Sequence, residues 1–219
     1  MFGLTFLISG DARQSVPHDR RRERGFSLIE LCIVLAILMI VAGMVFINAV
    51  TAIRDIRLHQ SAVSYANLLQ QARIRAVTDD TFYTVQTAIS GSNPIAFVDL
   101  SVGRTGIYAA GDPMMVFSQG VTYMAFSSGP AQANLESQFL PTGQAATVST
   151  TSTTPTFGAR GLPCEPSGSV CPYINGGLAT SYIQFLQNTQ SGKWEAVTIS
   201  PAARIRIWSY EGTTWSAMN

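Results

Sequence analysis

One apolar run near the N-terminus constrains the fold more than any other feature of the chain. Residues 26–50 read FSLIELCIVLAILMIVAGMVFINAV, and their single charged residue is Glu30. A helix over these residues would be about 38 Å long, whereas the hydrocarbon core of a bilayer is about 30 Å thick. The run therefore predicts a transmembrane segment at 26–50.

The flanks of this run predict its orientation. Residues 1–25 hold five arginines and three acidic residues, and the densest part is 20–24. Basic residues before the span place the N-terminus in the cytoplasm and the rest of the chain outside the inner membrane, in the periplasm. A secretory signal peptide is one alternative, but its apolar core is shorter and a small-x-small cleavage site is missing here. A plain signal anchor is the other, and it leaves Glu30 unexplained.

The junction at the start of the run carries a motif. A carboxylate inside an apolar span costs about 2.5–3.5 kcal/mol on insertion scales, so Glu30 marks a functional position. The letters RGFSLIE at 24–30, followed by about twenty apolar residues, resemble the type IV prepilin motif. The resemblance implies a leader at 1–25, cleavage after Gly25 by the membrane prepilin peptidase, and methylation of the new N-terminus at Phe26.

The resemblance also gives Glu30 a role in assembly. As the fifth residue after the cut, it would neutralise the terminal amine of a neighbouring subunit in a filament. The alternative is an incidental glutamate near a helix start, where the helix dipole also favours negative charge. That alternative does not account for the complete seven-residue match.

The rest of the chain predicts an α+β protein. Residues 51–80 contain no proline or glycine, and apolar residues at 53, 56, 63, 66, 69, 72 and 76 indicate an amphipathic helix that ends near Thr78. Residues 81–219 change to period two, which predicts a β-rich head. The Ser/Thr-rich residues 127–156 are expected to form a long exposed loop. The predicted strands are 81–89, 95–100, 114–126, 182–186, 194–200, 204–210 and 213–217.

A long N-terminal helix packed on an antiparallel sheet resembles the pilin fold. Within that fold the chain is most similar to the GspH/FimT group of minor pseudopilins. This finer resemblance rests on three short segments, QAR at 71–73, FGARGLP at 157–163 and ARIRIW at 203–208. Major pilins usually have a proline in the outer half of the helix, and none occurs between 26 and 78, which favours a minor component.

The cysteines predict one disulfide. Cys164 and Cys171 lie in a Pro/Gly/Ser-rich loop of the exported head, where disulfides persist, so we expect them to be bridged. Free thiols or half of a metal site are the alternatives, but the chain after the leader offers only His59 as a further ligand. Cys32 is expected to be a small apolar residue of the span. We expect no metal and no cofactor.

The sequence gives no sign of catalysis. His18 lies in the leader, so the head has no Ser-His-Asp or Cys-His arrangement, and its carboxylates are scattered. No glycine-rich phosphate loop follows a strand. We therefore expect that the protein is not an enzyme and that Gly25 is a substrate site for one.

DNA binding is the alternative function. Arg204 and Arg206 are two apart on a predicted strand and so share a face, where they could contact phosphates. Some FimT-type pilins bind DNA through a GRxR motif at this place, but Ala203 replaces the glycine here. Residues 26–219 hold nine basic and ten acidic residues, a net charge of −1, which disfavours DNA. A solvated or salt-bridged arginine pair is the structural alternative.

These expectations combine into one function. We expect a minor pilin or pseudopilin of the inner membrane that is assembled into a type IV pilus or a type II secretion pseudopilus, with a structural role in initiation or at the tip. Its partners would be other pilins, the prepilin peptidase and the assembly platform. An ordinary single-pass anchored protein is the third possibility. The head is itself poor in charge, with 18 charged residues among 51–219.

Overall fold

The structure is a computed structural model that describes residues 27–101, 103–140, 148–151, 154–175 and 178–218. It divides into two compact units, Met1–Val45 and Phe46–Asn219. The described part of the first unit is the N-terminal part of a helix, and the second unit holds the head. The predicted leader 1–25 and the predicted methylation site Phe26 lie outside the described residues.

Helix α1 runs from Leu28 to Thr78 and ends where the sequence predicts. Asp80 adopts a left-handed conformation with φ of 48°, and the Thr81 N–H donates to the Ala76 carbonyl at 3.1 Å. This is the pattern of a Schellman cap, in which a left-handed residue closes the last turn. Aspartate is one of the few residues besides glycine that enters this conformation readily, so the Asp79-Asp80 pair is a stop signal.

The stripe of α1 that packs on the head agrees with the prediction only in its C-terminal half. Leu69, Ala72 and Ala76 are buried as predicted and Ala66 is partly buried, whereas Ile53, Ile56 and Val63 are exposed. Apolar residues occur on more than one face of the N-terminal half, so periodicity alone does not decide which of them the head covers. The buried stripe consists of Leu58, Ala62, Tyr65, Leu68, Leu69, Ala72 and Ala76.

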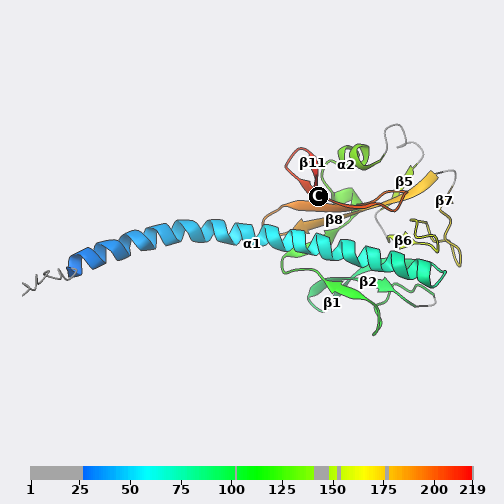
Figure 1. Cartoon of the computed structure of the whole chain (residues 1–219), viewed down its shortest axis with the longest axis horizontal. Helices are drawn as coiled ribbons and strands as arrows, with labels where there is room; N and C mark the ends of the chain where they lie inside the picture. The colour runs from blue at the N-terminus through cyan, green and yellow to red at the C-terminus, as the bar shows by residue number, and fades with distance from the viewer. Residues whose placement is uncertain (1–26, 102, 141–147, 152–153, 176–177, 219) are drawn as a thin grey trace, which may run out of the picture. The chain divides into compact units, whose positions relative to one another are not determined.

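The head contains two sheets, which lie above and below the C-terminal part of α1 in the view of Figure 1. The four-stranded sheet has the order β3 (Met114–Val116), β2 (Asn93–Asp99), β1 (Tyr83–Ser90) and β6 (Thr156–Phe157). The path of the seven-stranded sheet is β11 (Trp215–Met218), β10 (Ile205–Tyr210), β9 (Trp194–Ile199), β8 (Leu178–Asn188) and β4 (Val121–Met124). Two further strands pair with β8, namely β5 (Val148–Thr151), in parallel, and β7 (Ile174–Asn175).

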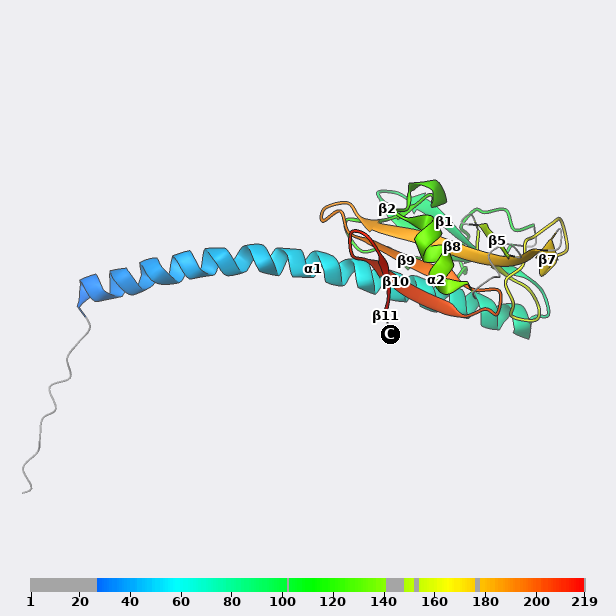
Figure 2. The same cartoon turned by 90° about the horizontal axis from the view of Figure 1, so that it is seen from above.

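Two apolar clusters hold these layers together. The larger one joins α1 to both sheets, with Tyr65 of α1, Val98 of β2 and Val197 of β9 among its buried members. The smaller one lies on the other face of the seven-stranded sheet, where helix α2 (Gln132–Phe139) covers it (Figure 2). Apart from the parallel pair of β5 with β8, the strand pairs between the described strands are antiparallel. This confirms the predicted α+β fold of a helix packed on antiparallel sheets.

The predicted loop at 127–156 is wrong over much of its length. Its residues include the single turn η1 (Phe126–Ser128), helix α2 and strand β5, whereas 141–147 and 152–153 lie outside the described residues. Leu135 is the only apolar residue of α2 that is fully buried, and it packs under Trp208 and Trp215. Leu135 and Phe139 are the only large apolar residues of these eight, and two residues give too short a pattern for the sequence to predict this helix.

The single strand predicted at 114–126 is also wrong. The chain pairs with β2 as far as Val116 and then joins β8 in the other sheet from Val121. A turn makes this change of sheet, with Gly120 at φ of 82° and the Val121 N–H donating to the Ser118 carbonyl at 2.9 Å. The alternating pattern continues through the turn because Phe117 is buried there too.

Within the part of the chain that the structure describes, no helix has the combined length and apolar character of a membrane span.

Candidate functional site

The processing motif lies at the start of α1. Gly25 and Phe26 are outside the described residues. The helix begins with the Leu31 N–H donating to the Ser27 carbonyl at 3.1 Å, and Glu30 lies in its first turn with an exposed side chain. Negative charge is favoured at a helix N-terminus, so the Glu30 carboxylate suits this position even before any partner is present.

Arg204 and Arg206 lie together, as their spacing predicts. Both line a hollow of about 300 Å³ against Phe139 of α2, and both also line a second hollow of about 330 Å³ against Asn67 and Gln70 of α1. Arg204 is exposed and Arg206 is half-buried. Among the described residues, neither guanidinium forms an ion pair, so the salt-bridged alternative is not what the structure shows.

The turn before this pair explains why a glycine suits the neighbouring position. Ala203 has a φ of 59°, in the left-handed region that glycine enters without steric cost. Its N–H donates to the Ser200 carbonyl at 2.8 Å, and the Ser200 N–H donates to the Arg204 carbonyl at 3.0 Å. The alanine therefore adopts here a left-handed conformation that glycine would adopt with less steric cost.

The three short segments of the GspH/FimT resemblance meet in space. The Arg73 Nη1 donates to the Ala203 carbonyl at 3.2 Å, which joins the helix segment to the β9–β10 turn. Gly161 of the segment at 157–163 has a φ of 69°, and a Cβ there would lie 3.3 Å from Arg73 Nε and 3.0 Å from Val77 Cγ2. Packing thus explains Arg73, Gly161 and Ala203, but these contacts do not account for the side chains of the exposed Arg204 and the half-buried Arg206.

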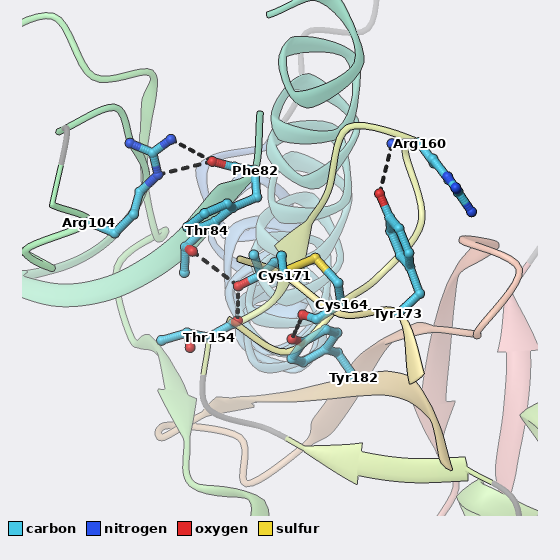
Figure 3. Close-up of a disulfide and its surroundings, with 10 residues drawn as sticks. Phe82, Thr84, Arg104, Thr154, Arg160, Cys164, Cys171, Tyr173 and Tyr182 are labelled. Atoms are coloured by element: carbon cyan, nitrogen blue, oxygen red, sulfur yellow. Dashed lines mark hydrogen bonds between the residues drawn. A yellow bond between two sulfur atoms is a disulfide. The ribbon is translucent and has the colours of Figure 1, made fainter. Parts of the chain in front are cut away.

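The structure contains the Cys164–Cys171 disulfide, with a Cα–Cα distance of 5.3 Å. The Tyr182 hydroxyl donates to the Cys164 carbonyl at 2.5 Å beneath the loop (Figure 3). Burial raises the pKa of Tyr182 to about 12, so this donor keeps its proton at any physiological pH. On the outer side of the loop, the Arg160 N–H donates to the Tyr173 hydroxyl at 3.0 Å (Figure 3). The bridge therefore fixes a loop that is packed at its base.

A charged cluster between α1 and the start of β9, in which only Glu195 is buried, was not predicted. His59 Nδ1 lies 3.6 Å from Glu195 Oε2, and neither atom has a hydrogen bond within the described residues. Lys193 Nζ lies 2.6 Å from Asp55 Oδ2 at the edge of the same hollow of about 450 Å³. Burial, and next the nearby Asp55 carboxylate, raise the pKa of Glu195 to about 7. The four residues come from two elements far apart in sequence, so only the fold brings them together.

The comparison with protein families gives one match. Residues 20–46 match the prokaryotic N-terminal methylation motif. This match supports a type IV pilin-like protein.

The matched segment contains Gly25, Phe26 and Glu30, and it indicates a subunit that is processed by a prepilin peptidase and interacts with other pilins. It also suggests a membrane-anchored N-terminus. No curated protein and no solved structure matches the chain.

Proposed function

We propose that this protein is a minor pilin or pseudopilin of the GspH/FimT type. Its precursor is inserted in the inner membrane by residues 26–50, cut after Gly25, methylated at Phe26 and assembled with other pilins. The observation that supports this proposal most strongly is the methylation motif at 20–46, which overlaps the start of a 51-residue helix that packs on a β-rich head. The role is mechanical rather than catalytic.

Further features support an exported head. The Cys164–Cys171 bridge suits an oxidising compartment such as the periplasm. The exposed Glu30 in the first turn of α1 is available to a cation of another subunit. The proposed filament is a type IV pilus or a type II secretion pseudopilus, with the protein at its initiation complex or tip and in contact with the assembly platform.

Incorporation into filaments tests this assembly role. The chain is expressed with a complete pilus or pseudopilus system, and sheared filaments are probed for it. We expect Glu30→Gln to be cut normally but to be reduced at least tenfold in the filament fraction. Glu211→Gln, an exposed carboxylate of the head, is the matched control and should behave as wild type. Equal incorporation of both variants contradicts the role given to Glu30.

DNA binding during uptake is the second candidate function, and the arginine pair favours it. Arg204 and Arg206 line the same hollows, and neither has an ion-pair partner among the described residues. A gel shift with the full chain in detergent micelles tests it over a range of salt concentrations, because phosphate contacts weaken as salt rises. Arg204→Ala/Arg206→Ala should abolish binding, whereas Arg75→Ala, an exposed arginine of α1, should not. Binding that is unchanged in the double variant rejects this candidate.

A further inference from the structure

The hollow of about 450 Å³ beside α1 has a buried carboxylate in its wall. One side of the hollow comes from α1, and the other comes from β9, β10 and β11. Glu195 lines it and is only 5% exposed. We call this feature the helix–sheet hollow, and the residues that matter here are Asp55, Ile56, His59, Trp194, Glu195 and Met218.

The polar groups of the helix–sheet hollow lack hydrogen-bond donors. Three of their atoms are buried and have no hydrogen bond among the described residues, namely Asp55 Oδ1, His59 Nδ1 and Glu195 Oε2. An ionised carboxylate can only accept hydrogen bonds, and a neutral imidazole always has one accepting nitrogen. Buried acceptors that find no donor destabilise the protein, so a ligand that supplies N–H groups here gains binding energy from each of them.

The charges of the helix–sheet hollow do not balance. Lys193 Nζ is already paired with Asp55 Oδ2 at 2.6 Å. His59 Nδ1 lies 3.6 Å from Glu195 Oε2, which is too far for a hydrogen bond. When His59 is neutral, the two carboxylates and the one ammonium leave a net charge of −1. The chemistry that fits is therefore a cation that also donates hydrogen bonds.

The mouth of the helix–sheet hollow is apolar. Ile56 of α1 is 54% exposed, Met218 of β11 is 37% exposed, and the half-buried Trp194 lines the hollow with them. The face of an indole ring attracts a cation, and a planar guanidinium can also stack on it. Apolar residues around a charged contact exclude water from it once a partner covers them. This combination favours a side chain carried by a protein over a free small cation.

We infer that the helix–sheet hollow binds an arginine side chain of another protein, with apolar residues on either side of that arginine. The guanidinium would donate to the carboxylates of Glu195 and Asp55, and its flat face would lie against Trp194. Five N–H groups in a rigid fork suit carboxylates on two different walls better than the compact ammonium of a lysine does. The hollow belongs to the folded head, so this contact goes beyond the proposed function and does not depend on leader processing.

Binding of a cation at this place depends on the ionisation of Glu195. Burial, and next the Asp55 carboxylate, raise the pKa of Glu195 to about 7, so its carboxyl group is neutral at pH 5 and ionised at pH 8. The other charged or titratable groups that face it are Asp55 and His59 of α1 and Lys193 before β9. A proton on His59 adds positive charge and acts in the same direction. A guanidinium therefore binds more tightly at pH 8 than at pH 5.

A pair of short peptides tests the inference directly. The probe is a fluorescent peptide with blocked ends and one arginine between two leucines, and its control has citrulline, which is neutral and of nearly the same shape. By fluorescence anisotropy at pH 8, the full chain in detergent micelles should bind the arginine peptide at least tenfold more tightly than the citrulline peptide. The arginine peptide should also bind at least tenfold more weakly at pH 5. Equal binding of the two peptides at pH 8 overturns the inference.

Variants then locate the binding site. Glu195→Gln keeps the shape of the side chain and removes its charge, so it should weaken binding of the arginine peptide at pH 8 at least tenfold. Glu136→Gln, which changes a half-buried carboxylate of α2 on the other face of the sheet, is the matched control and should bind as wild type. Circular dichroism verifies that both variants fold. Unaltered binding in Glu195→Gln overturns the inference.

Two other ligands are distinguished by the same assay. A lysine peptide that binds as tightly as the arginine peptide assigns the hollow to an ammonium group and overturns the inference. Zn²⁺ added alone is the last probe. If Zn²⁺ binds to the wild type but not to Glu195→Gln, and the arginine peptide binds to neither, the hollow is a metal site and the inference is overturned.

Discussion

His59 Nδ1 of α1 and Glu195 Oε2 of β9 lie 3.6 Å apart where the helix packs on the sheet, and neither atom has a hydrogen bond among the described residues. Asp55 and Lys193 are the other charged groups at this contact. A proton on either atom of the pair would allow a hydrogen bond between the helix and the sheet. The contact is therefore a place where pH acts on the packing of α1 against the head.

The first prediction is a loss of stability as pH rises. Burial raises the pKa of Glu195 from 4.5 to about 7, so between these values the native state holds a proton that the unfolded chain has lost. The free energy of unfolding should then fall with rising pH over this window, by up to about 3 kcal/mol, and level off above it. Urea denaturation of the full chain in micelles at pH 5 and pH 8 measures the fall.

Glu195→Gln is the control for this effect. The amide is neutral at both pH values and has nearly the same shape, so the variant should lose most of the difference in stability between pH 5 and pH 8. A variant that keeps the whole difference shows that another group is responsible.

The second prediction concerns two buried tyrosines with opposite hydrogen bonding. The Tyr65 hydroxyl is fully buried and has no hydrogen-bond partner among the described residues, whereas the Tyr182 hydroxyl donates to the Cys164 carbonyl. Tyr65→Phe removes an unpaired polar group and should raise the free energy of unfolding by about 1 kcal/mol. Tyr182→Phe breaks a buried hydrogen bond and should lower it by about 1–2 kcal/mol. Denaturant titration measures both, and equal losses in the two variants contradict this account.

The third prediction is that the head depends on its disulfide. Cys164 and Cys171 are seven apart in sequence, so the bridge closes a short loop, and removing it should cost about 2–3 kcal/mol through the entropy of the unfolded chain. Thermal unfolding of the full chain with and without a reductant gives the value. Cys32→Ala should leave that difference unchanged, because Cys32 is the free cysteine. A melting temperature that the reductant does not change contradicts the structural role of the bridge.

The sequence predicts those parts of the fold that have local signals. The end of α1 follows from Asp79-Asp80, and the strands around β1, β2, β9 and β10 follow from alternating apolar residues between turns. Helix α2 is not predicted, because Leu135 is its only fully buried residue and the helix has no regular apolar face. The buried face of α1 is predicted at Leu69, Ala72 and Ala76 but not in the N-terminal half, where Leu58, Ala62 and Tyr65 are buried in place of Ile53, Ile56 and Val63 and only contact with the sheets decides between the two sets.

The candidate sites divide in the same way. Glu30 can be predicted from the motif at 24–30 and the Arg204–Arg206 pair from its spacing, because each signal is local in the sequence. The cluster of Asp55, His59 and Glu195 depends on the pairing of α1 with β9, which is 130 residues or more away in the chain. Asp55 and His59 do share a helix face at a spacing of four, but that pattern by itself fits any solvent-exposed helix.

Removal of residues 1–25 by a prepilin peptidase is the step on which the proposed function depends. The chain is expressed with and without an active prepilin peptidase, and its N-terminus is determined by mass spectrometry. We predict that the enzyme removes residues 1–25, leaves a methylated Phe26 at the new N-terminus, and fails on a Gly25→Leu variant. An intact leader, in cells where the same peptidase cuts a control prepilin, would contradict the account.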